Sequence, residues 1–282
     1  MITPNDYENA YENKWCPGCG NFAILDAMKN AFAEMDIPPE EILLISGIGQ
    51  AAKTPHFLRC NMFHTLHGRA LPIATGAKMA NHGLNIVVNA GDGDCYGEGG
   101  NHFLNAIRRN IDLTLLVHNN RIYGLTQGQA SPTTRVGMVT KMQRKGVVSD
   151  AFNPVAAAIS MKAGFVARGF SGAPDQLRFL IQKALEFKGL AMIDILQPCV
   201  TFNKINTFQW FKKRVYDLAE TDYDPGDEIR AFEGEQTPEE NIPTGIIYTN
   251  PKPSFTERIE ALKDRPLVSA QRDAEKIHNL LI

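Results

Sequence analysis

Two short polar motifs near the middle of this 282-residue chain contain the residue types of a metal–diphosphate site. The first is Gly91–Asp94 (Gly-Asp-Gly-Asp), and 25 residues separate Gly93 from the second, the pair Asn119–Asn120. The Asp92 carboxylate and the Asn120 amide oxygen are hard ligands of the kind that Mg²⁺ takes, and glycines beside Asp92 let the backbone approach phosphate closely. A Gly-Asp-Gly tripeptide alone is more often a simple turn, so the prediction depends on both motifs together.

The elements around these motifs are predicted to bring them together. Each motif closes an apolar run, residues 86–90 and residues 113–117, which is typical of a buried parallel strand. Between the two runs, Phe103, Leu104 and Ile107 recur at helical spacing and indicate a crossover helix. Parallel strands end at the same edge of a sheet, where open α/β sheets bind ligands, so Asp92 and Asn120 are expected to be neighbours.

The chain as a whole is predicted to be an α/β protein with a doubly wound, mainly parallel sheet. Apolar runs of helical and strand type alternate from about residue 21 to residue 196, and such alternation places helices on both faces of the sheet. After Gln197 the regular period is lost, residues 222–240 are rich in Pro, Asp and Glu, and a short helix is expected near residues 270–281. We therefore predict a domain over residues 1–200 and an irregular extension over residues 201–282 that packs on the domain or on a partner subunit.

Composition excludes several classes of function. The formal net charge is -2, which does not favour a nucleic-acid partner. Hydrophobic residues make up 44% of the chain, which fits a globular protein with a sizeable core. No apolar stretch approaches the ~20 residues needed to span a bilayer, so no membrane partner is expected. Residues 1–14 are polar and acidic, unlike a signal peptide, and the expected location is cytoplasmic.

The cysteines indicate metal or redox chemistry. Cys16 and Cys19 form a C-x₂-C pair, which suits thioredoxin-like chemistry, zinc or an iron–sulfur cluster. The polar residues 9–14 do not provide the strand that a thioredoxin motif follows, and the second cysteine pair typical of zinc sites is absent from the sequence. Cys199 follows the last predicted strand at the same sheet edge as Asp92, so it could meet the N-terminal pair; taken alone, it would be an inert buried thiol.

The pair of motifs resembles the cofactor motif of thiamine diphosphate enzymes. This resemblance implies that Asp92, the side-chain oxygen of Asn120 and the carbonyl of Ile122 hold Mg²⁺. Two diphosphate oxygens and a water would complete an octahedron around the ion.

A longer series of motifs resembles the β subunit of 2-oxoacid:ferredoxin oxidoreductases, the 2-oxoglutarate type most of all. The resemblance continues through Cys199 to residues 202–203 and 210–212, and so covers nearly the whole chain. The motifs occur in the order Trp15–Gly20, Ser46–Gly49, His64–Ala70, Gly91–Asp94 and Ile122–Thr126.

The resemblance implies a thiamine diphosphate-dependent oxidative decarboxylation of a 2-oxoacid, 2-oxoglutarate above all, to an acyl-CoA and CO₂. Electrons would pass through a [4Fe–4S] cluster to ferredoxin, and the reaction could run in reverse. The glutamate that activates the cofactor comes from the α subunit in this family, so the chain is expected to be active only with that partner.

The same resemblance assigns the cluster ligands, with one departure. Three of them fall at Cys16, Cys19 and Cys199, but the fourth position is occupied by Gln50, an amide where a thiolate is expected. The alternatives are Cys60 or Cys95 as the fourth ligand, a cluster with one non-cysteine ligand, a three-iron cluster, or no cluster.

The resemblance also implies the residues around the cofactor. His67 and Lys53 are the catalytic candidates. His64 and Arg69 are weaker candidates for contacts with the cofactor, and Gln127 stands where many relatives have a lysine that could pair with a substrate carboxylate. The cofactor-binding set is Ile48, Gly49, Gln50, His67, Gly91, Gly93, Asp94, Asn120, Gly124, Leu125 and Thr126.

Three other functions stay open at this point. The substrate could be pyruvate or a branched-chain 2-oxoacid. The chain could be half of a non-redox thiamine diphosphate decarboxylase without a cluster, which Gln50 favours slightly. It could also be a structural or electron-transfer subunit with a vestigial cofactor site, although the intact Asp92 and Asn120 speak against this.

Overall fold

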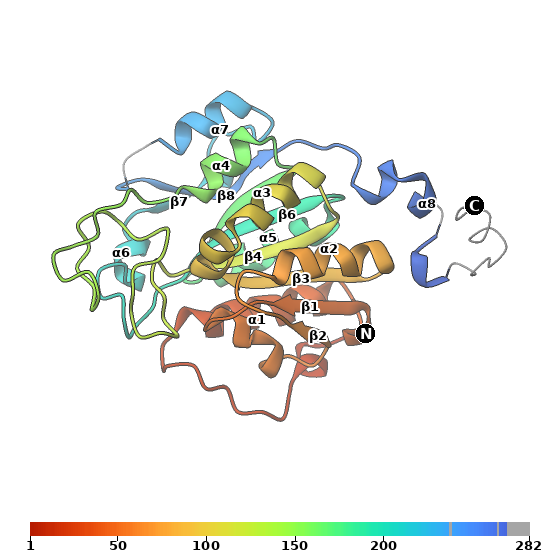
Figure 1. Ribbon diagram of the computed structural model, residues 1–282, viewed down its shortest axis with the longest axis horizontal. Coiled ribbons are helices and arrows are strands. Elements are labelled where there is room, and N and C mark those ends of the chain that lie inside the picture. Colours follow the sequence, from red (N-terminus) through yellow and green to blue (C-terminus); the bar gives the residue numbers. More distant parts are fainter. Residues whose placement is uncertain (237–238, 264, 270–282) are drawn as a thin grey trace, which may run out of the picture.

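The fold is built on one eight-stranded sheet with the strand order β2-β1-β3-β4-β6-β5-β8-β7 (Figure 1). The computed structural model describes residues 1–236, 239–263 and 265–269; the helix expected near residues 270–281 lies outside them. The strands are β1 (Ile42–Ser46), β2 (Asn61–His64), β3 (Asn85–Gly91), β4 (Leu113–Asn119), β5 (Phe165–Phe170), β6 (Leu190–Leu196), β7 (Val215–Asp217) and β8 (Ile242–Thr249).

Helices cover both faces of the sheet, as the alternating pattern predicts (Figure 1). One buried cluster joins the sheet to α1 and α5, and another joins it to α2, α3 and α4. Val87 faces the first cluster and Val88 the second, because successive strand residues point to opposite faces. The helices are α1 (Gly20–Glu34), α2 (Ala70–Ala80), α3 (Gly100–Arg109), α4 (Pro154–Ser160), α5 (Pro174–Glu186), α6 (Phe208–Lys212), α7 (Glu228–Gly234) and α8 (Glu260–Lys263).

The first six strands are parallel, which confirms the doubly wound fold class. After β1 the chain moves outward to β2 and then returns to the other side of β1 to form β3. The carboxyl ends of β1 and β3 therefore flank a topological switch point, the usual ligand site of such sheets.

The C-terminal extension is more regular than the sequence indicates. β8 pairs antiparallel with β5, and β7 pairs parallel with β8, so this part completes the sheet edge. A small buried cluster anchors it through Phe170, Leu196, Phe211 and Ile242. The expectation of an irregular segment was wrong for these residues, whereas the domain boundary at residue 200 stays a prediction. Within the described part of the chain, every helix is too short or too polar to cross a membrane.

Candidate active site

Asp92 lies directly after β3 at the switch point and is 1% exposed. Its Oδ2 accepts hydrogen bonds from the hydroxyls of Ser131 and Thr133, both at 2.5 Å. Burial raises the pKa of Asp92 to about 6, although the two hydroxyl donors oppose this rise. Among the described residues, no lysine, arginine or histidine forms an ion pair with this carboxylate. A buried carboxylate that lacks a cationic partner is a suitable ligand for a divalent cation.

The two asparagines after β4 lie in different surroundings. Asn119 is buried, accepts from the Thr133 hydroxyl at 2.8 Å and donates to Asp194. The Asn120 Oδ1 accepts from the backbone N–H of Ile122 at 3.0 Å, a turn that holds the Ile122 backbone at the strand end. A carbonyl oxygen has two lone pairs, so this bond leaves Asn120 able to bind a metal, and its role stays a prediction.

Asp94 ties together the loops that follow β1, β2 and β3. Its Oδ1 accepts from the backbone N–H groups of Ile48 at 3.1 Å and Gly68 at 2.7 Å, and from His67 Nδ1 at 2.6 Å. The close packing of the Asp94 side chain against the loop after β1 requires glycine at position 47, because a Cβ there would lie 2.0 Å from Asp94 Oδ2. The hydrogen bond to Asp94 raises the pKa of His67, whose side chain is 38% exposed.

The glycines at the switch point leave open space beside the backbone. A Cβ added to Gly49 or Gly91 would meet no heavy atom within 4 Å, and Gly49 has φ +135°. Gly93 instead packs under the Tyr123 ring, which a Cβ would approach to 2.1 Å. The space beside Gly49 and Gly91 fits a diphosphate that binds through backbone N–H groups.

The structure brings three of the five cysteines together. Cys16, Cys19 and Cys199 line one small pocket, and Gln50 and Asn120 lie on its wall. Burial, with smaller effects from Cys199 and Cys16, raises the pKa of Cys19 to about 11. Gln197 Nε2 donates to the Cys19 sulfur at 3.5 Å, a contact that the sequence did not indicate.

This pocket is not a site for a single ion. Within the described residues, no group of three or more His, Cys, Asp or Glu side chains is close enough to hold one metal ion. An iron–sulfur cluster has a different requirement, because each thiolate binds its own iron atom. The three cysteines and Gln50 therefore fit a cluster better than they fit zinc.

Cys60 and Cys95 lie outside the cysteine pocket. Cys60 lines a separate depression with Ile2 and Arg59, and burial raises its pKa to about 12. Cys95 is 4% exposed and packs in the core on the α2 side of the sheet. Neither lines the pocket that Cys16, Cys19 and Cys199 share, which speaks against either of them as the fourth ligand.

The remaining candidates lie around the same sheet edge. His64 Nδ1 lies 2.8 Å from Ser46 Oγ, and burial lowers the pKa of this histidine. Lys53 is half-buried in the helical turn after β1, and Arg69 donates to His102. Gln127 is exposed and accepts a hydrogen bond from Lys141 Nζ at 3.2 Å, so a lysine from another part of the chain lies beside it.

The fold and site define a thiamine diphosphate enzyme domain. Residues 47–195 match the family described as thiamine pyrophosphate enzyme, C-terminal TPP binding domain. Residues 199–264 match a second family, which is described as the C-terminal part of the pyruvate ferredoxin oxidoreductase β chain.

Whole-chain comparisons narrow this class further. The chain is 45% identical to the 2-oxoacid:ferredoxin oxidoreductase 1 subunit beta of Aeropyrum pernix over 264 residues, 90% of this chain and 83% of that protein. It is 44% identical to the 2-oxoglutarate oxidoreductase subunit KorB of Mycobacterium tuberculosis, over 70% of this chain and 53% of that protein. The solved 2-oxoglutarate:ferredoxin oxidoreductase from Magnetococcus marinus, with 2-oxoglutarate, coenzyme A and succinyl-CoA bound, matches with a TM-score of 0.93 and 36% identity, covering 100% of this chain and 96% of that one. The chain belongs to the family of 2-oxoacid:ferredoxin oxidoreductase β subunits.

Proposed function

We propose that this chain, with an α subunit, oxidatively decarboxylates 2-oxoglutarate to succinyl-CoA and CO₂ and passes the electrons to ferredoxin. The observation that carries this proposal is the buried Asp92 at the switch point, together with a pocket that is lined by Cys16, Cys19 and Cys199 and also by Asn120. The substrate is supported by the KorB relatives and by the ligands named for the Magnetococcus marinus structure.

Thiamine diphosphate, when bound, supplies the nucleophile that adds to the 2-oxoacid carbonyl and stores the electrons left after CO₂ departs. For this chain we assign Mg²⁺ to Asp92, to the Asn120 side chain and to the Ile122 carbonyl. The diphosphate is assigned to the backbone around Gly49, Gly91 and Gly93, and to the turn at Gly124–Thr126. The open space at Gly49 and Gly91 supports this cradle.

His67 is proposed to hold or move a proton at the cofactor. Because Asp94 binds Nδ1 at 2.6 Å, the Nε2 atom is the one left to face a ligand, and the raised pKa increases the protonated fraction near neutral pH. Lys53, on the turn after β1, is proposed to contact the substrate or the cofactor.

We further propose that Cys16, Cys19 and Cys199 bind a [4Fe–4S] cluster whose fourth ligand is not a cysteine. Gln50 lines the pocket in place of the fourth cysteine, and its backbone is fixed because Trp15 Nε1 donates to its carbonyl oxygen at 2.8 Å. A non-redox decarboxylase remains the alternative that the departure at Gln50 favours.

Product analysis tests the substrate assignment. The complex with its α subunit is supplied with CoA, ferredoxin and, in turn, 2-oxoglutarate, pyruvate or a branched-chain 2-oxoacid. We expect succinyl-CoA to form with the highest kcat/KM. A higher kcat/KM for pyruvate would overturn the substrate assignment and leave the reaction class intact. CO₂ release without ferredoxin reduction would instead support the non-redox alternative.

A further inference from the structure

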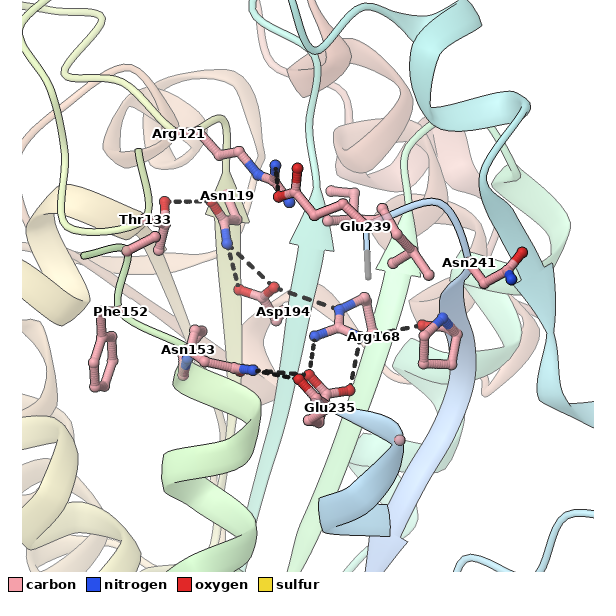
Figure 2. A pocket seen from close by; sticks show the side chains of 16 residues that line it. Asn119, Arg121, Thr133, Phe152, Asn153, Arg168, Asp194, Glu235, Glu239 and Asn241 are labelled. Atoms are coloured by element: carbon pink, nitrogen blue, oxygen red, sulfur yellow. Dashed lines mark hydrogen bonds and ion pairs between the residues drawn. The ribbon is translucent and has the colours of Figure 1, made fainter. Parts of the chain in front are cut away.

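A buried series of hydrogen bonds and ion pairs connects Asp92, which follows β3, to the segment of the C-terminal extension that follows helix α7. Four of its links are visible in Figure 2, from Thr133 through Asn119, Asp194 and Arg168 to Glu235. We propose that Thr133, together with the polar residues behind it, positions the Asp92 carboxylate for the metal, so that the C-terminal extension supports the cofactor site. This inference rests on the proposed function, because it assumes that Asp92 binds Mg²⁺.

The first link is a shared hydroxyl group. Thr133 Oγ1 lies 2.5 Å from Asp92 Oδ2 and 2.8 Å from Asn119 Oδ1, and both of these atoms are acceptors. Ser131 Oγ also lies 2.5 Å from Asp92 Oδ2. With Oδ2 held from two sides, the carboxylate has little freedom to rotate. Partners of this kind fix the orientation of a metal ligand, and their loss typically lowers metal affinity about 10–100-fold.

The middle links lie on three neighbouring strands. Asn119 ends β4 and donates from Nδ2 to both oxygens of Asp194 on β6, at 3.1 and 3.2 Å. Asp194 also accepts from the Tyr96 hydroxyl at 2.9 Å and lies 3.9 Å from Arg168 Nε on β5. Asp194 and Arg168 are 2% and 8% exposed, so solvent screens these contacts little.

The last link reaches the C-terminal extension. Arg168 donates to both carboxylate oxygens of Glu235, at 2.8 and 2.6 Å, and the Glu235 side chain is 3% exposed. Glu235 directly follows α7, and Asn153 at the start of α4 donates to it as well. Removing the Glu235 charge would leave Arg168 buried without its partner, which would disturb its contact with Asp194.

These residues border a cavity of about 230 Å³, so they are not packed on all sides. Their hydrogen bonds can therefore be removed by substitution with little effect on packing. Thr133→Val keeps the branched shape of the side chain and removes the hydroxyl bonds, and the adjoining cavity leaves room for the added methyl group to shift. The sequence predicted neither Thr133 nor Glu235, since no motif marks them.

The test measures thiamine diphosphate binding by calorimetry on the complete complex, stripped of metal and cofactor, as Mg²⁺ is titrated at a fixed cofactor concentration. In Thr133→Val we expect the half-saturating Mg²⁺ concentration to rise about tenfold. Thr133→Ser, which retains the hydroxyl, should stay near the wild-type value. Glu235→Gln should raise the value by a smaller factor, because five links separate it from Asp92. Thr114→Val is the matched control: Thr114 is a buried threonine at the other end of β4 whose hydroxyl donates to Ala184.

Equal Mg²⁺ dependence in Thr133→Val and the wild type would overturn the inference. The same loss in Thr133→Ser as in Thr133→Val would also overturn it, because the hydroxyl would then not be the cause. A Glu235→Gln variant that folds and keeps the wild-type Mg²⁺ dependence would overturn the role of the C-terminal extension, and if this variant does not fold, the two Thr133 variants still decide the role of Thr133. Wild-type protein that shows no Mg²⁺-dependent cofactor binding would refute the proposed metal site itself, a result distinct from either outcome above.

Discussion

At the scale of single residues, the decisive group is a carboxylate with an unusual environment. Asp92 is fully buried, accepts only neutral hydroxyl donors from side chains, and has its pKa raised to about 6. Such a group is costly to the folded state unless a cation compensates its charge. The buried position is therefore explained by the metal site that we propose.

Replacing Asp92 with asparagine tests this residue directly. We expect Asp92→Asn to weaken Mg²⁺-dependent thiamine diphosphate binding at least about 100-fold, since a direct ligand should contribute no less than its supporting partners. Calorimetric titration of the complex measures this change in affinity. Asp26→Asn, a change at an exposed position on α1, serves as the control. Unchanged cofactor binding in Asp92→Asn would contradict the assignment.

The sequence predicted the position of Asp92 but not its partners. Its glycine neighbours and its spacing from Asn119–Asn120 form a motif, whereas Ser131 and Thr133 lie in a loop with no regular period. Side chains from such loops reach a site through tertiary folding alone. For the same reason the hydrogen bond between Asp94 and His67, 27 residues apart, could not be read from spacing.

At the scale of elements, a buried histidine connects β3, β4 and α1. His118 Nδ1 lies 2.8 Å from Asn21 Oδ1 on α1, and its Nε2 lies 3.2 Å from Asn89 Nδ2 on β3. Burial lowers the pKa of His118 to about 3, so the ring is neutral and bridges the two amides.

Acid should weaken this connection. An unfolded histidine has a pKa of about 6.5, so between pH 6.5 and pH 3 the unfolded chain binds a proton that the folded chain does not, and stability falls as the pH drops. From pH 7 to pH 5, His118 should cost the folded state about 2 kcal/mol. Urea denaturation should show this loss in the wild type and in the exposed control His56→Gln, but a smaller loss in His118→Gln. Equal losses in all three proteins would contradict the argument.

Element prediction succeeded where strands are uniformly apolar and failed where polar residues are buried. The runs that form β3, β4 and β6 were found, with ends extended by one or two residues. β5 was missed because Arg168 and Gly169 interrupt its pattern, and the buried arginine is tolerated there because it pairs with Glu235 and Asp194. β2 is a four-residue exposed edge strand, and β8 contains Pro243 and Gly245, which weaken strand signals.

The small core under α6 should contribute measurably to stability. Phe211 is 1% exposed and packs on Phe170 with ring centroids 5.7 Å apart. We expect Phe211→Ala to lower the free energy of unfolding by about 3–5 kcal/mol. Phe179→Ala, on the exposed side of α5, should change it by less than about 1 kcal/mol. A loss below about 1 kcal/mol for Phe211→Ala, measured by urea denaturation, would show that this segment is not anchored by its core.

At the scale of the whole molecule, the site lies at an open sheet edge with exposed apolar side chains around it. Leu66, Leu125 and Ile205 follow β2, β4 and β6 and are 76%, 42% and 50% exposed. Apolar side chains around a site are typical of a surface that a partner covers, in keeping with the β-subunit relatives. The activating glutamate that the family resemblance assigns to the α subunit is proposed to come from across this surface.

The isolated chain should therefore be catalytically silent. With thiamine diphosphate, Mg²⁺, CoA and 2-oxoglutarate present, we expect dye reduction only after the α subunit is added. Rates are compared for the chain alone, the α subunit alone and the two together. Substantial 2-oxoacid-dependent reduction by this chain alone would show that its active site is complete without a partner.

The most direct test of the whole account is electron paramagnetic resonance of the complex, purified anaerobically, before and after addition of 2-oxoglutarate and CoA, together with iron and acid-labile sulfide analysis. We predict about four iron and four sulfide per β subunit and a reduced-cluster signal that develops only with the 2-oxoacid. About three iron atoms per β subunit would mean that the cluster lacks the iron atom next to Gln50. No iron, with CO₂ still released from the 2-oxoacid, would contradict the oxidoreductase account and leave a non-redox thiamine diphosphate enzyme.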